Sequence, residues 1–125
     1  MKVLMEKKVI EQLLFDFYGE LLTDKQKVIM DYYYNDDCNL AEIGDLVQVT
    51  RQGVYDAVKR SRGLMKSYEE KLGLVERFLK SQTLIDDVIQ ELEKVLQNEA
   101  VNKNKMLREE LTDVKRKMTK ISDDY

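Results

Sequence analysis

The side chains best suited to chemistry lie between Thr50 and Lys66, where basic and amide groups recur at helical spacing. They are Thr50, Arg51, Gln52, Tyr55, Lys59, Arg60, Arg62 and Lys66. Lysine and arginine neutralise phosphate, and arginine and glutamine can donate to base edges, so these residue types predict nucleic-acid contact. Residues 51–66 hold five basic residues and one acidic residue, a net +4 in a chain whose net charge is −3. A basic segment on an acidic protein is typical of a nucleic-acid-binding surface, and a solvated helix face is the alternative.

The sequence on either side of Thr50 predicts a helix-turn-helix, in which one helix crosses a nucleic-acid backbone and a second enters a groove. We expect a first helix over residues 40–46, a turn at residues 47–49 that Val49 fills, and a second helix from Arg51 that the Thr50 hydroxyl caps. Apolar residues recur at steps of three and four in both helices. Those expected to face inward are Leu40, Ile43, Leu46, Val54, Ala57 and Val58. The basic side chains then face outward, and Tyr55 either joins them or packs against a neighbouring helix.

The preceding residues predict two more helices and no strand. Helical spacing of apolar residues favours a helix over residues 3–18 that ends at Gly19, and a second over residues 24–35 that Thr23 caps. The residues expected in the core are Val9, Ile10, Leu13, Leu14, Phe17, Val28, Ile29, Tyr32 and Tyr33. Residues 35–39 form a polar loop, and its last residue caps the helix that follows.

The chain changes character after Gly73, which should end the basic helix. An apolar stripe from Leu84 to Leu96 predicts that residues 74–97 form a helix or helices, largely buried on the same domain or on a second subunit. Residues 98–125 predict a heptad-like helical tail. Its apolar residues are Leu107, Leu111, Val114, Met118 and Ile121. We therefore predict an all-α protein, with a helix-turn-helix domain in residues 1–73 and long C-terminal helices, assembled as a homodimer through the stripe.

The composition argues against an enzyme and against a bound cofactor or metal. Histidine is absent and Cys38 is the only cysteine, so the commonest general base and the commonest transition-metal ligands are missing. No apolar run is long enough to span a membrane, and the charged N-terminal residues do not form a signal peptide. We expect a cytoplasmic protein without membrane insertion.

Several motifs carry a resemblance to known families. Residues 40–51 with the basic helix after them resemble the C-terminal promoter-reading region of bacterial sigma factors. Over residues 1–97 the chain resembles the YlxM family of small bacterial proteins. The motifs that carry this second resemblance are Leu14-Phe15-Asp16-Phe17-Tyr18-Gly19, Leu22-Thr23-x-Lys25-Gln26, Tyr32-Tyr33-Tyr34-x-Asp36-Asp37 and Thr50-Arg51-Gln52-Gly53-Val54-Tyr55-Asp56. The resemblance implies a regulatory protein whose gene lies beside that of the signal recognition particle GTPase, with a role in that targeting pathway.

The basic helix departs from the sigma pattern at Gly53, Val54 and Asp56. A glycine inside a helix costs up to ~1 kcal/mol relative to alanine and removes one base contact, and Asp56 repels phosphate unless it is paired. We expect DNA as the ligand, with structured RNA as the alternative. A module that binds the particle's GTPase, without reading DNA sequence, is the second hypothesis for the function.

Overall fold

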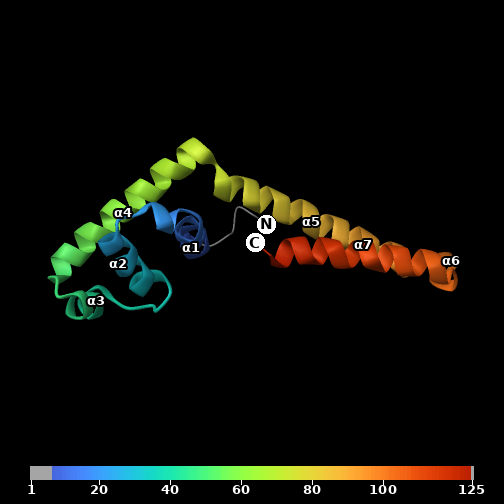
Figure 1. The fold of residues 1–125 in the computed structure, drawn as a ribbon, viewed down its shortest axis with the longest axis horizontal. Coiled ribbons are helices and arrows are strands. Elements are labelled where there is room, and N and C mark those ends of the chain that lie inside the picture. Colours follow the sequence, from blue (N-terminus) through green and yellow to red (C-terminus); the bar gives the residue numbers. More distant parts are fainter. Residues whose placement is uncertain (1–6, 125) are drawn as a thin grey trace. The chain divides into compact units, whose positions relative to one another are not determined.

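The computed structural model describes residues 7–124, and every regular element in that range is a helix. The elements are α1 (Lys7–Tyr18), the 3-10 turn η2 (Gly19–Leu21), α2 (Asp24–Tyr34), α3 (Leu40–Val47), α4 (Arg51–Leu72), α5 (Leu74–Leu96), α6 (Glu99–Lys103) and α7 (Lys105–Asp123) (Figure 1). The all-α prediction is confirmed. Residues 3–6 of the first predicted helix lie outside the described residues.

The chain divides into two compact units, residues 1–75 and residues 76–125, and each is described by itself. In the first unit, α1, α2 and α3 all pack against the long helix α4. The division falls inside α5, two residues after the predicted domain boundary at residue 73.

The helices of the first unit begin where the sequence supplies capping groups. The Thr23 hydroxyl accepts from the Gln26 N–H at 3.2 Å, and the Gln26 side chain accepts from the Thr23 N–H at 3.0 Å. Asn39 and Glu42 form the same reciprocal pair at the start of α3, at 2.8 and 2.9 Å. Each pair satisfies two N–H groups that have no partner inside the helix. The predicted caps are confirmed.

The core of the first unit is built from all four of its helices. Its buried apolar side chains are Leu14, Phe15, Tyr18, Leu22, Ile29, Met30, Ile43, Val54, Val58, Met65 and Val75. Fully burying one such side chain contributes roughly 1.5–3 kcal/mol. Phe15 and Tyr18 were not among the core residues that the sequence predicted.

Tyr18 also connects α1 to the start of α5. Its hydroxyl donates to Glu69 Oε1 at 2.5 Å and accepts from the Leu74 N–H at 3.1 Å, and Glu69 Oε1 accepts from the Val75 N–H at 3.0 Å. Burial and the nearby Glu69 carboxylate raise the pKa of the Tyr18 phenol. The two side chains therefore satisfy the first N–H groups of α5, which follows α4 after one residue, Gly73, at φ 63°.

Three of the residues predicted to face inward are exposed. Leu46, Val28 and Val9 retain 55%, 47% and 44% of their surface. All three lie on sides of their helices that the neighbouring helices leave uncovered. The prediction was wrong for these positions.

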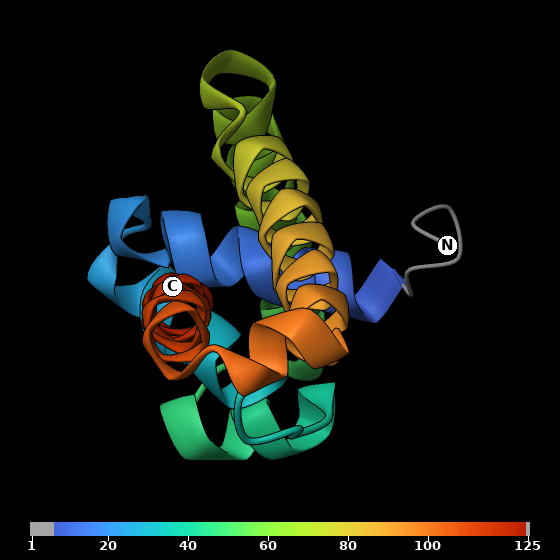
Figure 2. The same ribbon diagram turned by 90° about the vertical axis from the view of Figure 1, so that its right-hand side faces the viewer.

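The second unit contains α6, α7 and α5 from Glu76 onward, and α5 and α7 run side by side in opposite directions (Figure 1). Figure 2 looks along this pair and shows α6 joining the two helices at the near end. The Ser122 hydroxyl donates to the Gln82 side chain at 2.8 Å, and Lys115 Nζ lies 3.9 Å from Glu93 Oε1. Asn98 and Asn104 cap α6 and α7.

The apolar stripe of α5 is only partly covered. Ile85 is buried, but Leu84 and Val95 retain 65% and 42% of their surface. A single neighbouring helix covers only one side of a wide stripe, so within one chain Leu84–Leu96 is only partly buried. Burial of the rest of the stripe on a second subunit stays a prediction. None of the described helices has the length and apolarity that crossing a membrane requires.

Candidate nucleic-acid interface

The turn between α3 and α4 brings the two helices of the motif into close contact. Gln48 adopts the left-handed conformation at φ 58°, and the Val49 N–H donates to the Gly44 carbonyl at 3.0 Å. A β-carbon at Gly44 would lie 2.5 Å from the Val49 carbonyl oxygen. The absence of a side chain at Gly44 is thus what allows the turn to close against α3.

Gly53 has a structural role that the sequence interpretation missed. A β-carbon there would lie 2.6 Å from Val49 Cγ1, because this position faces the turn. The absence of a side chain at Gly53 therefore allows Val49 to pack closely against α4, which accounts for a residue with low helix propensity at this position. The loss of a base contact at Gly53 stays a prediction.

The start of α4 is fixed by Thr50, whose hydroxyl accepts from the Gly53 N–H at 3.0 Å. Val54 and Val58, at 0% and 4% exposure, turn one face of the helix into the core. The rest of the helix surface is in solvent. The residues predicted to contact nucleic acid that are exposed here are Thr50, Arg51, Gln52, Tyr55, Lys59, Arg60 and Lys66. We call these seven residues the α4 basic face.

The cations of the α4 basic face have no ion-pair partner among residues 7–124: Arg51, Lys59, Arg60 and Lys66. The acidic residue on this face, Asp56, accepts from the Gln52 amide at 3.2 Å. Tyr55 is 47% exposed, so it lies on this face and not in the core.

Arg62 has a different environment. Its Nε lies 2.7 Å from Glu11 Oε1, its Nη2 donates to the Tyr33 hydroxyl at 2.8 Å, and its guanidinium carbon lies 5.4 Å from the centre of the Tyr33 ring. The Tyr34 hydroxyl donates to the same Glu11 oxygen at 3.1 Å. Arg62 therefore joins α4 to α1 and α2, and we leave it out of the α4 basic face.

Glu11 is the residue of this cluster that sequence reasoning missed. It is 8% exposed, and it shares a helix face with the buried Leu14, Phe15 and Tyr18, at steps of three, four and seven. A carboxylate in that register needs a cation or a hydroxyl donor. Burial raises the pKa of Tyr34 to about 12, with the Glu11 charge adding to the effect and Arg62 opposing it.

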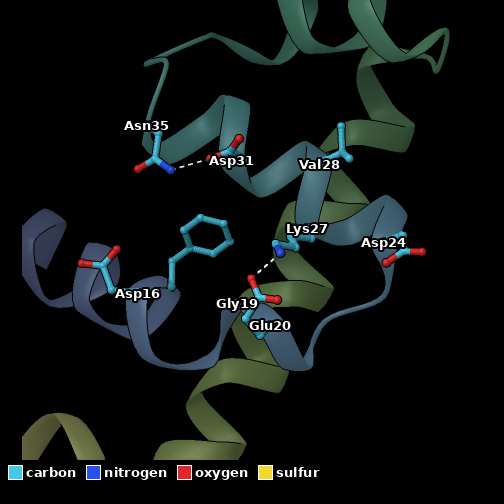
Figure 3. A pocket seen from close by; sticks show the side chains of 9 residues that line it. Asp16, Gly19, Glu20, Asp24, Lys27, Val28, Asp31 and Asn35 are labelled. Carbon is cyan, nitrogen blue, oxygen red and sulfur yellow. Dashed lines mark hydrogen bonds and ion pairs between the residues drawn. The ribbon is translucent and has the colours of Figure 1, made fainter.

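A groove between α1 and α2 is acidic, so its charge is opposite to that of the α4 basic face. It has a volume of about 530 Å³, and four carboxylates line it (Figure 3): Asp16, Glu20, Asp24 and Asp31. Lys27, the one cation in the groove, pairs with Glu20. Carboxylates repel phosphate, so this side of the unit does not favour nucleic acid. No group of histidine, cysteine or acidic residues among the described residues could hold a metal ion.

Comparison with known proteins identifies relatives of similar size. The family model described as "Putative helix-turn-helix protein, YlxM / p13 like" (UPF0122) matches residues 5–123. The UPF0122 protein of Thermoanaerobacter sp. (strain X514) is 45% identical over 87 residues, which are 70% of this chain and 74% of the relative. That of Caldanaerobacter subterraneus subsp. tengcongensis is 49% identical over 76 residues, 61% of this chain and 65% of the relative. That of Listeria innocua serovar 6a is 43% identical over 91 residues, 73% of this chain and 83% of the relative.

Proposed function

The chain belongs to the YlxM/p13-like family of helix-turn-helix proteins, and from this premise we propose that it is a regulatory protein that binds nucleic acid through α4. The observation that carries the proposal is the set of exposed cations without ion-pair partners on this helix: Arg51, Lys59, Arg60 and Lys66. Such cations are free to replace the counterions of phosphate groups, and the released counterions favour binding. The carboxylates of the groove between α1 and α2 repel phosphate, so α4 is the helix of this unit that we expect to attract it.

DNA is the ligand that the motif favours. An α-helix fits the major groove of B-DNA, and the outward side chains of a recognition helix then reach base edges. Gln52 and Tyr55, exposed in the first two turns of α4, occupy the positions for such contacts. Structured RNA is the second candidate, because Lys and Arg contacts to phosphate serve both polymers.

We predict that the double substitution Arg51→Ala/Lys59→Ala weakens nucleic-acid binding at least ~10-fold and lowers the slope of log affinity against log salt by about two units, one for each lost phosphate contact. Both side chains are exposed, so the fold should be unchanged. Fluorescence anisotropy with duplex DNA and with hairpin RNA between 50 and 200 mM salt measures both quantities.

The matched control for this prediction is Lys71→Ala/Lys105→Ala. It removes two exposed cations outside the α4 basic face. We expect the control to keep the affinity of the parent within about twofold. Equal affinities for parent and Arg51→Ala/Lys59→Ala, on both DNA and RNA, would place the site elsewhere.

The pathway implied by the family resemblance, signal recognition particle targeting in the cytoplasm, offers both an RNA and a protein as ligands. DNA stays the ligand that the motif favours, and within this pathway the RNA is the component that the α4 basic face would contact. Titration with purified particle RNA and with purified particle GTPase separates the two hypotheses for the function. Steeply salt-dependent binding to RNA supports the proposal, and salt-insensitive binding to the GTPase alone supports a protein-interaction module.

We also propose that the second unit forms a homodimer. It exposes large apolar side chains on two helices, α5 and α7: Leu84, Val95, Met106, Leu107, Val114 and Ile121. Exposed apolar groups that continue a heptad-like spacing are typical of helices that pair with a second copy. A dimer would present two α4 basic faces to one nucleic acid, and it would therefore contact a larger part of the nucleic acid than one chain can.

Sedimentation equilibrium at micromolar concentration should give twice the 14.8 kDa mass of one chain. Leu84→Glu should return the mass to that of one chain while circular dichroism stays helical, because Leu84 is 65% exposed within the chain. Gln90→Glu, at an exposed polar position of α5, is the control with the same added charge. A single-chain mass for the parent protein would contradict the dimer.

A further inference from the structure

A second groove lies beside the α4 basic face and differs in chemistry from the acidic one. Its volume is about 450 Å³, within the range of pockets that hold small ligands. It is formed by the first turns of α2, by Val49 in the turn and by α4. Gly53 and Ala57 face it from α4, and their small size leaves the space open.

The rim of this groove is cationic. Lys25 of α2 and Arg60 of α4 both line it, both are exposed, and neither has an ion-pair partner among residues 7–124. Two unpaired cations from different helices converge on one opening. Charge complementarity therefore favours an anionic ligand, and phosphate is the anion that both side chains bind well.

The interior of the groove is apolar, with one amide donor. Val49 and Ala57 form its walls, and Ile29, only 1% exposed, closes its floor. In the Gln26 side chain, Oε1 accepts from the Thr23 N–H, whereas the Nε2 amide group has no hydrogen-bond partner among the described residues. A ligand that matches these walls combines an anionic group with a flat apolar body that carries hydrogen-bond acceptors.

We propose that this groove receives one unpaired nucleotide of the bound nucleic acid, with its phosphate between Lys25 and Arg60 and its base against Val49 and Ala57. The inference rests on the proposed function and specifies a feature of the ligand. In a continuous duplex the faces of the bases are stacked, so only phosphate and sugar could reach the groove. An unstacked base can bury its face against apolar walls or an arginine plane and offer its edge to the Gln26 amide.

The test compares four probes by fluorescence anisotropy at several salt concentrations between 50 and 200 mM: an RNA stem with a single-nucleotide bulge, the same stem fully paired, and the two DNA counterparts. We expect the parent to bind at least one bulged probe about tenfold more tightly than its paired counterpart, since stacking or burying one base contributes roughly 1–3 kcal/mol. The RNA and DNA arms show which polymer supplies the nucleotide. An abasic bulge, which keeps the phosphate and removes the base, should lose the preference.

A variant that fills the groove tests its location. Ala57→Met adds no charge, and we expect it to bring the ratio of bulged to paired affinity close to one while the affinity for the paired stem changes less than twofold. Ala100→Met, the same change at an exposed position of α6, should keep the ratio of the parent. Melting followed by circular dichroism verifies that each variant is folded.

The outcomes separate this inference from the proposed function. Equal affinity for bulged, abasic and paired probes overturns the nucleotide groove and leaves the proposed function standing. A bulge preference that persists in folded Ala57→Met, or with the abasic probe, overturns it as well. If no probe binds with a steep salt dependence, the proposed function itself fails.

Discussion

Replacing Gly44 by alanine should lower the free energy of unfolding of the first unit by about 2 kcal/mol, a typical cost of overpacking. The substitution places a β-carbon 2.5 Å from the Val49 carbonyl oxygen, a backbone atom that cannot rotate away. The Gly44 carbonyl also accepts from the Val49 N–H, so a shift that relieves the clash strains this hydrogen bond. The steric cost exceeds the gain of up to ~1 kcal/mol that alanine brings to a helix.

Gly63→Ala is the matched control, because a β-carbon at Gly63 meets no atom within 4 Å. Here only the helix propensity of α4 changes, and we expect an increase of about 0.5–1 kcal/mol in the free energy of unfolding. Urea titration followed by tyrosine fluorescence suits the comparison, since the first unit contains six of the seven tyrosines. If Gly44→Ala also increased the free energy of unfolding, the turn at Val49 would not be tightly closed.

The features of the fold that depend only on residues close together in the sequence could be predicted. Thr23, Asn39 and Thr50 cap helices because a side-chain oxygen reaches an N–H three residues ahead, whatever surrounds it. Gly73 ends α4 because the left-handed backbone favours glycine. Such short-range rules place the helix boundaries within a residue or two.

Burial was harder to predict because it depends on distant partners. Helical spacing shows which residues share a face, but the width of the contact is set by the neighbouring helices. Leu46 and Leu84 continue apolar stripes and remain exposed, since no described helix covers that edge. Tyr18 is buried because α1 packs against α4, where it contacts Tyr68 and Glu69, and Phe15 is buried against Tyr34 of α2.

The candidate site shows the same division. The α4 basic face follows from the register of one helix, and all seven of its residues could be named from the sequence. The nucleotide groove could not, since Lys25 and Arg60 come together only when α2 packs against α4. The pairing of Glu11 with Arg62 likewise joins residues that are far apart in the sequence.

Arg62→Met should lower the free energy of unfolding of the first unit by about 3 kcal/mol, the lower end of the range for removing one partner of a buried ion pair. The loss is at that end because the Arg62 side chain is 37% exposed while that of Glu11 is 11% exposed. Without the guanidinium, the Glu11 carboxylate keeps only the Tyr34 hydroxyl as a donor. The double variant Glu11→Gln/Arg62→Met removes both charges, so it should recover most of the loss in a double-mutant cycle.

Nucleic-acid binding by the folded variants distinguishes a structural Arg62 from one that contacts the ligand. Lys59→Met makes the same kind of change at an exposed side chain without an ion-pair partner among residues 7–124. We expect Lys59→Met to weaken binding and leave stability within ~0.5 kcal/mol, and Arg62→Met to do the reverse when affinity is measured well below its melting temperature. The helical register alone places both residues on the outward side of α4, and the packing of α1 and α2 separates their roles. Reduced affinity in folded Arg62→Met, with unchanged stability, would contradict this assignment, because a side chain held between Glu11 and Tyr33 can reach a phosphate only by leaving both.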